Sequence, residues 1–345
     1  MDSNKYRYCF VDTSYLVRRN GWVVSKGKAP GEYNYLDIVK MSIQTVNKMA
    51  RDYGVTADKF IFVFDAWSRE YEGYYRSWLI KDIIEYKGSR TFETVEGLKE
   101  LEASGASEAE LRYYADRLYA NQQIKDAKKM LMSMGPIGIP SISVESFEFD
   151  DLVYMAGVLM VREDKPSVIL TKDSDLQYCT TPGLDYFKMP VSGSDPEFIT
   201  YQEMWDRVPD DLKESLIARS IPDYGSALYY YKALLDSLGE GHNDLKKTKR
   251  PRKNANRVLH EILVDDNWDN VIDKPAFLRQ LESFKVFEFP KAFEAYQAIC
   301  SIPQCGHYAS TQEFENFCQA TGLQGISSEY YQTFLNRLDQ KLFSE

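Results

Sequence analysis

Short apolar runs that reach a carboxylate mark the strands expected in the first half of the chain. Three of them are rich in β-branched and aromatic residues and meet an Asp at or near their end: residues 6–12, 59–65 and 167–173. Their length and composition are typical of strands buried in a parallel sheet. Further strands are predicted over 139–144 and, as a pair of edge strands, over 184–189 and 198–201.

Helical spacing of apolar residues fills the stretches between these strands. Residues 36–53 carry apolar side chains at intervals of three and four, which predicts a helix. Residues 92–134 are charged and helical in pattern, with an interruption near 103–105 and a stop at Gly135-Pro136. A further helix is expected over 148–162, with carboxylates in its first turn.

The order of the elements predicts the architecture. Strands that alternate with helices favour an α/β fold with a mostly parallel sheet flanked by helices. After residue 201 the strand patterns stop, and the remaining chain has helical patterns. We therefore expect an α/β domain over 1–204 and a helical domain over 205–345.

Composition restricts the classes of protein. The chain has 345 residues, of which 44% are hydrophobic, and a net charge of −10. It contains no apolar run of about 18 residues, so we expect no membrane span. Residues 1–5 lead straight into a strand, and the five cysteines are odd in number and scattered, which favours a cytoplasmic protein without disulfides.

Acidic side chains follow the predicted strands. Asp12, Asp65 and Asp173 come at strand ends, and more carboxylates open the helix at 148. Because the carboxyl ends of parallel strands share one edge, these groups are expected to meet there. Each motif alone also fits helix capping or an Asx turn. Together they favour a site for hard divalent cations, since clustered carboxylates repel one another without one.

One basic segment stands out in this acidic chain. It comprises Lys246, Lys247, Lys249, Arg250, Arg252, Lys253 and, slightly later, Arg257. Such a run is either a solvated loop or a contact for phosphates, and beside a predicted cation site we favour phosphate binding.

Taken in order, these motifs resemble the phage and bacterial 5′-to-3′ exonuclease and flap endonuclease family, with the T-even phage type ribonuclease H as the nearest pattern. The acidic matches are Asp12 with Ser14, Phe64-Asp65, Glu148-x-Asp150-Asp151 and Asp173-x-Asp175-Leu176. The basic and aromatic matches are Arg19, Trp78, Lys81, Tyr86, Lys87 and Arg90. The resemblance covers about residues 6–260.

The resemblance implies a PIN-like sheet with a two-metal site, followed by a helix-turn-helix-type DNA-binding element. Two Mg²⁺ ions, for which Mn²⁺ can substitute, are expected. The resemblance assigns Asp12, Asp65, Glu148 and Asp150 to the first ion, Asp151 to a bridging or outer position, and Asp173, Asp175 and Glu240 to the second. Glu240 belongs to residues 239–244, where Asn243 replaces a carboxylate of the family pattern.

The resemblance also implies the substrate and its contacts. The expected substrates are branched or nicked duplex DNA with a 5′ flap and RNA–DNA hybrids. The protein would cut them during DNA replication, in the host cytoplasm if it belongs to a phage. Lys87 and Arg90 would contact the scissile phosphate, the basic segment would hold the duplex, and residues 91–125 would form an arch for the 5′ end. A monomer is expected, with a single-strand-binding protein or sliding clamp as partner.

Other classes fit the sequence less well. A haloacid-dehalogenase-like phosphatase needs a second Asp where Ser14 stands. A PIN-type ribonuclease is shorter and lacks the helical part and the basic segment. A catalytically decayed, structure-specific DNA-binding protein is suggested by Phe149 and Asn243. The spacing of Cys300, Cys305, His307 and Cys318 matches no common zinc motif.

Overall fold

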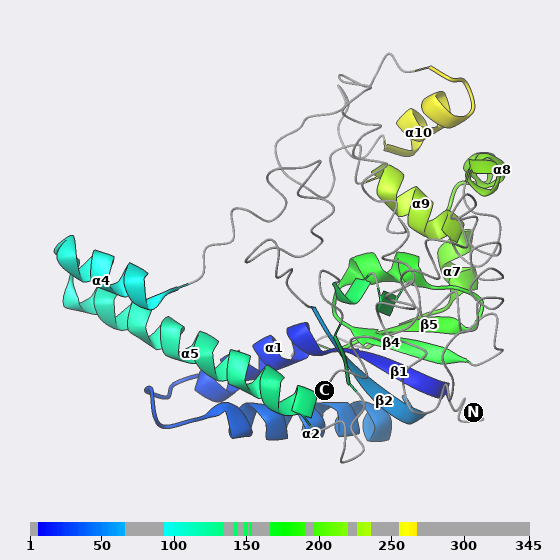
Figure 1. The fold of residues 1–345 in the computed structure, drawn as a ribbon. Helices are drawn as coiled ribbons and strands as arrows, with labels where there is room; N and C mark the ends of the chain where they lie inside the picture. The colour runs from blue at the N-terminus through cyan, green and yellow to red at the C-terminus, as the bar shows by residue number, and fades with distance from the viewer. Residues whose placement is uncertain are drawn as a thin grey trace, which may run out of the picture.

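A parallel sheet forms the centre of the protein, as the computed structural model in Figure 1 shows. The structure describes residues 6–65, 93–133, 141–143, 148–150, 152–153, 166–190, 196–219, 226–235 and 255–267. Within these ranges the sheet has six strands in the order β3-β2-β1-β4-β5-β6. The strands are β1 (Tyr6–Asp12), β2 (Ala57–Phe64), β3 (Ser141–Ser143), β4 (Ser167–Thr171), β5 (Leu184–Lys188) and β6 (Glu197–Ile199).

The direction and order of the strands confirm the predicted α/β class. Neighbours from β3 to β5 run parallel, and β6 pairs antiparallel with β5 as an edge strand. From β1 the chain proceeds to β2 and β3 on one side, and then returns to β4 on the other side of β1. The direction of winding therefore reverses between β1 and β4.

Three helices pack on one another and cover one face of the sheet (Figure 1). They are α1 (Thr13–Ser25), α2 (Tyr35–Tyr53) and α5 (Glu108–Ser133). Helix α2 begins with a capping box between Asn34 and Asp37 and ends at Gly54, whose φ of 68° suits glycine. Helix α5 approaches α1 closely, because a Cβ on Gly21 would lie 2.7 Å from Cγ1 of Ile124.

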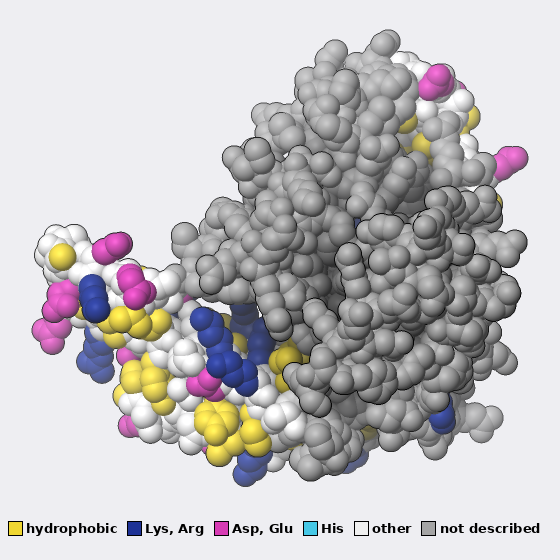
Figure 2. All heavy atoms as spheres, in the orientation of Figure 1, with side chains coloured by type: hydrophobic (Ala, Val, Ile, Leu, Met, Phe, Trp, Pro, Cys, Tyr) yellow, Lys and Arg dark blue, Asp and Glu magenta, His cyan; other side chains and the backbone are white. Residues whose placement is uncertain are grey.

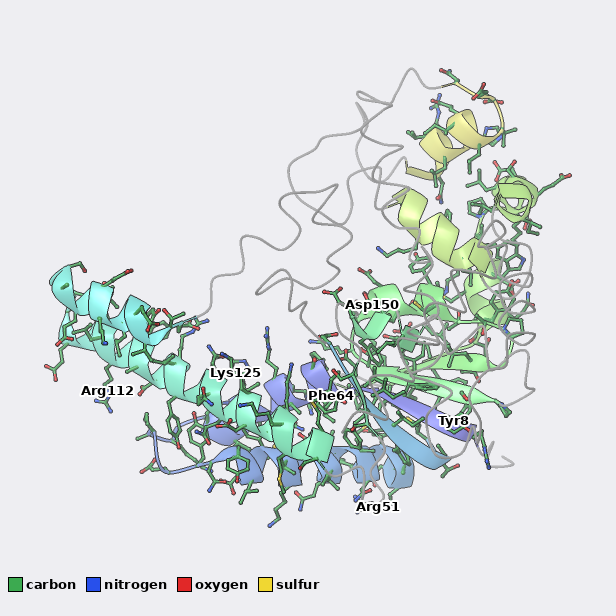
Figure 3. The ribbon with its side chains drawn as sticks, in the orientation of Figure 1. Tyr8, Arg51, Phe64, Arg112, Lys125 and Asp150 are labelled. Atoms are coloured by element: carbon green, nitrogen blue, oxygen red, sulfur yellow. The ribbon has the colours of Figure 1, made fainter. Side chains whose placement is uncertain are left out.

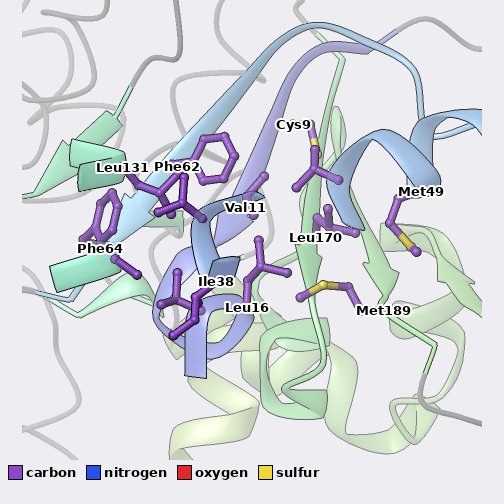
Figure 4. Close-up of a cluster of buried hydrophobic side chains, with 14 of the residues drawn as sticks. Cys9, Val11, Leu16, Ile38, Met49, Phe62, Phe64, Leu131, Leu170 and Met189 are labelled. Carbon is purple, nitrogen blue, oxygen red and sulfur yellow. The ribbon is translucent and has the colours of Figure 1, made fainter. Parts of the chain in front are cut away.

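The core lies between this helical layer and the sheet (Figure 4). Alternate residues of the strands point into it, among them Cys9 and Val11 of β1 and Leu170 of β4. Leu16, Ile38 and Leu131 meet them from α1, α2 and α5. The other side chains of β1 and β4 are also buried, on the opposite face, so both strands are covered on two sides. The backbone pairing between neighbouring strands sets the height at which each strand ends.

A helical hairpin extends from the body (Figure 1). It consists of α4 (Val95–Ala103) and the first half of α5, and it matches the predicted helical stretch with its break. Acidic side chains gather at its outer end beside basic ones, and further basic side chains lie where it meets the body (Figure 2). The exposed acidic residues are Glu96, Glu100, Glu102, Glu108 and Glu110.

Helices follow the sheet, as predicted. They are α7 (Tyr201–Asp206), α8 (Asp210–Arg219), α9 (Ser226–Leu235) and α10 (Ala255–Leu263). Helix α9 packs on the 3₁₀ helix η2 (Ser174–Cys179) and on α8, and α10 packs on α8. Helix α7 spans the expected boundary at 204/205, which stays a prediction. Among the described helices, none is long and apolar enough to cross a membrane.

Candidate functional site

The carboxyl ends of β1 and β4 define the place where a ligand is expected in this sheet. In open α/β sheets, ligands bind outside the strand ends at the point where the winding direction reverses. That point lies between β1 and β4. Val11 pairs with Leu170 in the register, so Asp12 and Thr171 reach the edge side by side. The sheet therefore delivers Asp12 to the predicted position.

Asp12 is a buried carboxyl group with two hydrogen-bond donors. Its side chain is 8% exposed and caps α1, because Oδ1 accepts a hydrogen bond from the Tyr15 N–H at 3.0 Å. Thr171 donates from Oγ1 to Oδ2 at 2.8 Å. Burial raises the pKa of Asp12 to about 7, and the negative charge of Asp65 adds to the rise, while both hydrogen bonds oppose it. A cation at this edge would offset both causes.

Asp65 joins the end of β2 to the helical turn that begins at Phe149. Its Oδ1 accepts a hydrogen bond from the Phe149 N–H at 2.8 Å. Its own N–H donates to Oγ of Ser14 at 3.4 Å. Backbone N–H groups of Phe149 and Asp65 thus connect the end of β2 to the acidic motif at Glu148 and to Ser14.

Glu148 and the helical residues 149–150 that follow it lie beside this edge, because the Phe149 N–H bonds to Asp65. Glu148 is buried, and Asp150 is partly buried and lies above the strand ends near Phe64 (Figure 3). Phe149, a bulky residue between two carboxylates, is 2% exposed and contributes to the core. The large side chain therefore does not obstruct the edge, because only its N–H faces Asp65. Asp151 lies outside the described residues.

Asp173 and Asp175 follow β4. Asp173 donates its N–H to Oγ1 of Thr171 at 3.1 Å and caps η2 by accepting from the Asp175 N–H at 3.0 Å. Its charge also contributes to the raised pKa of Asp12. Asp175 pairs with Lys232 of α9, with 3.5 Å between Oδ2 and Nζ. Thr171 therefore links the two acidic strand ends.

The structure adds a basic residue that the sequence analysis did not select. Lys128 on α5 donates from Nζ to Oγ of Ser14 at 3.0 Å. Burial lowers the pKa of Lys128, Asp65 and Asp12 oppose that fall, and Arg18 adds to it. The signal in the sequence is its spacing, since Lys128 falls within the apolar stripe of Ile124, Ala127 and Leu131.

The other predicted contacts fall into two groups. Arg19 is partly buried and donates to Oδ1 of Asn20 at 3.3 Å, and Arg257 on α10 pairs with Glu261. Neither bond reaches the acidic edge. The remaining predicted residues lie outside the described ranges: Trp78, Lys81, Tyr86, Lys87, Arg90, Glu240, Lys246, Lys247, Lys249, Arg250, Arg252 and Lys253, together with the four Cys and His positions after residue 299.

The donor set suits a hard cation that retains water. Carboxylate oxygens are the ligands that Mg²⁺ prefers, and Mg²⁺ is often held by one or two of them with several waters. Within the described ranges, no three His, Cys, Asp or Glu side chains are close enough to hold a metal directly. Their spacing fits coordination in part through water.

Comparison with known proteins gives structural similarity only. No family model and no curated protein sequence matches the chain. The T5 5′-exonuclease with bound zinc ions shares 15% identity, covers 87% of this chain and 91% of its own, and has a TM-score of 0.48.

Two further solved structures are similar at the same level. The bacteriophage T5 D15 flap endonuclease in a complex with DNA and metal ions has 13% identity, coverage of 92% and 99%, and a TM-score of 0.48. Flap endonuclease-1 from Methanococcus jannaschii has 14% identity, coverage of 92% and 93%, and a TM-score of 0.45. Similarity at TM-scores below 0.5 does not establish a function for this chain.

Proposed function

We propose that this protein is a divalent-metal-dependent nuclease that hydrolyses phosphodiesters at the acidic edge of its sheet. The single observation that carries the proposal is the meeting of Asp12 and Thr171 at the reversal point, with Asp65 and Asp173 close enough to raise the pKa of Asp12. The cost of burying Asp12 beside other carboxylates is offset when a cation binds. We refer to Asp12, Asp65, Glu148, Asp150, Asp173 and Asp175 as the acidic edge.

The chain's own residues hold this edge in place before any ion binds. Tyr15 and Thr171 fix the two oxygens of Asp12, and the Phe149 N–H fixes Asp65. When bound, Mg²⁺ ions supply an activated water and stabilise charge on the phosphate. Because each anchor is a backbone group or a short side chain, binding requires little rearrangement of the protein.

A phosphodiester also requires positive groups beside the acidic edge. Lys87 and Arg90 are the residues we assign to the scissile phosphate, on the strength of their motif. The segment from Lys246 to Arg257 is assigned to the backbone of the duplex. Lys125 is exposed on α5 (Figure 3), and Arg18 is exposed on α1, so both add positive charge to the helical layer.

The substrate we propose is a 5′ end of nucleic acid at a junction with duplex. The order of the acidic motifs supports 5′-to-3′ exonuclease and flap endonuclease activity, and the T-even pattern supports ribonuclease H activity on primers during phage replication. The α4–α5 hairpin projects away from the body (Figure 1), and we propose it as part of the arch for the 5′ end. We further propose that the protein works as a monomer in the host cytoplasm, with a single-strand-binding protein or sliding clamp as partner.

Cleavage of defined substrates tests the proposal. A 5′-labelled flap duplex and an RNA–DNA hybrid are incubated with the protein in Mg²⁺, in Mn²⁺ and in chelator. Release of short 5′ products in either metal, and none in chelator, is expected. Binding of the flap without cleavage in both metals would instead identify a structure-specific DNA-binding protein.

A further inference from the structure

Lys128 is the one lysine of α5 that combines partial burial with a hydrogen bond to Ser14, which lies beside the acidic edge. Its Nζ donates a hydrogen bond to Oγ of Ser14 at 3.0 Å, although the two residues are 114 positions apart in the sequence. A lysine in a buried stripe loses hydration, and such a position persists in proteins only where other groups compensate. Here the compensating groups are the Ser14 hydroxyl and the charges of Asp65 and Asp12.

Ser14 connects Lys128 to the end of β2. Its Oγ accepts hydrogen bonds from Lys128 Nζ and from the backbone N–H of Asp65. The Asp65 carboxylate is in turn held by the Phe149 N–H. A continuous path therefore runs from α5 through Ser14 and Asp65 to the helix that carries Glu148 and Asp150.

The charges around Lys128 come from three elements. Asp12 ends β1, Asp65 follows β2, and Arg18 lies on α1, where it repels the ammonium group. The two carboxylates are the same groups that a divalent cation would approach. A positive side chain and a metal ion at the same carboxylates oppose each other, because each reduces the negative potential that attracts the other.

We propose that Lys128 is a positioning residue of the acidic edge, which holds Ser14 and Asp65 in place and supplies a built-in positive charge that competes with the divalent cation. Without a metal, this charge reduces the repulsion between Asp12 and Asp65. With a metal, it limits the affinity of the edge and retains the orientation of Asp65 through Ser14. The inference rests on the proposed metal-dependent function.

Mn²⁺ binding to the metal-free protein separates this role from a structural one. Lys128→Met removes both the charge and the donor. If that variant does not fold, Lys128→Gln takes its place, because it removes the charge but keeps an N–H donor. Lys129→Met is the matched control, because Lys129 is exposed on the same helix and pairs only weakly, at 3.7 Å, with Asp126. Lys128→Arg keeps the charge.

Titration of the proteins with Mn²⁺, followed by electron paramagnetic resonance of the free ion, gives the affinities. Removing a positive charge that interacts with Asp65 and Asp12 is expected to tighten Mn²⁺ binding by about tenfold in Lys128→Met. Lys129→Met and Lys128→Arg are expected to match the wild type. In thermal melts with chelator, Lys128→Met should be less stable than the wild type. In melts with Mn²⁺, it should gain more stability from the metal than the wild type does.

The hydrogen bond to Ser14 has its own variant. Ser14→Ala keeps the charge of Lys128, so its Mn²⁺ affinity should not tighten, but cleavage at saturating Mn²⁺ should fall by about tenfold, as expected for the loss of a second-layer contact. An unchanged or weaker Mn²⁺ affinity in folded Lys128→Met or Lys128→Gln overturns the competing charge. Unchanged cleavage in Ser14→Ala overturns the positioning role.

Failure of the proposed function gives a different pattern. A wild-type protein that binds Mn²⁺ but cuts no substrate refutes the nuclease, while the ratio of affinities between the Lys128 and Lys129 variants still decides the competing charge. A wild-type protein that binds no Mn²⁺ refutes both the function and the inference.

Discussion

Replacing Asp12 with Asn should make the metal-free protein less sensitive to alkaline pH. Burial, and next the charge of Asp65, raises the pKa of Asp12 from 3.8 to about 7. Between pH 3.8 and about 7, the folded protein therefore keeps a proton on Asp12 that the unfolded chain releases. The resulting contribution to stability is complete below pH 3.8 and is lost as the pH rises through about 7.

The size of the effect follows from the shift. About three pKa units correspond to about 4 kcal/mol over the whole range, at 1.36 kcal/mol per unit. Between pH 6 and pH 8 the loss from a group with a folded pKa near 7 is about 1.4 kcal/mol. Asn cannot lose a proton, yet its Oδ1 can still accept from the Tyr15 N–H.

Urea unfolding in chelator at pH 6, 7 and 8 measures this difference. The wild type should lose about 1.4 kcal/mol more between pH 6 and pH 8 than Asp12→Asn does. Thr171→Val removes a hydrogen bond that favours the charged form of Asp12, so the pKa of Asp12 should rise further. The loss of stability with rising pH should therefore extend to higher pH in this variant than in the wild type. Parallel pH profiles for the wild type and Asp12→Asn would refute the raised pKa.

Three other perturbations test separate parts of the structure. Asp150→Ala should abolish cleavage and leave binding of flap DNA largely unchanged; cleavage that persists would remove Asp150 from the site. Replacing Lys246, Lys247, Arg250 and Arg252 together with Ala should weaken duplex binding and reduce the slope of log K against log salt by about 3 to 4, and an unchanged slope would exclude phosphate contacts there. Gly21→Ala should cost about 1–3 kcal/mol in a thermal or urea melt, because the new Cβ meets Ile124; a stability equal to wild type would show that α5 can move away from α1.

The strands and the acidic edge were predictable from the sequence because each signal is local. An apolar run followed by Asp gave β1 and β2 within two residues of their observed bounds, and the helix at 36–53 differs from α2 by one residue. The edge strands at 184–189 and 198–201 correspond to β5 and β6, which pair as expected. Asp173 was expected at the end of a strand, but β4 ends at Thr171 and Asp173 instead caps η2.

Features that depend on contacts distant in sequence were missed. Helix α1 was not predicted, because its buried face includes Asn20 and Gly21, which break the apolar pattern. Asn20 can be buried because its side-chain amide donates hydrogen bonds to Ser42 and Thr45 of α2. Gly21 is buried because α5 packs closely against it. Lys128 was missed for the same reason, since its partner Ser14 lies on another element and only the three-dimensional structure joins them.

Metal-dependent cleavage of a flap duplex by the wild type and by Asp150→Ala is the most direct test of the central claim that the acidic edge is a nuclease site. A 5′-labelled flap and an RNA–DNA hybrid are compared in Mg²⁺ and in chelator. Short 5′ products are expected from the wild type in Mg²⁺ only, and none from Asp150→Ala. Cleavage in chelator, or equal cleavage by the variant, would contradict it.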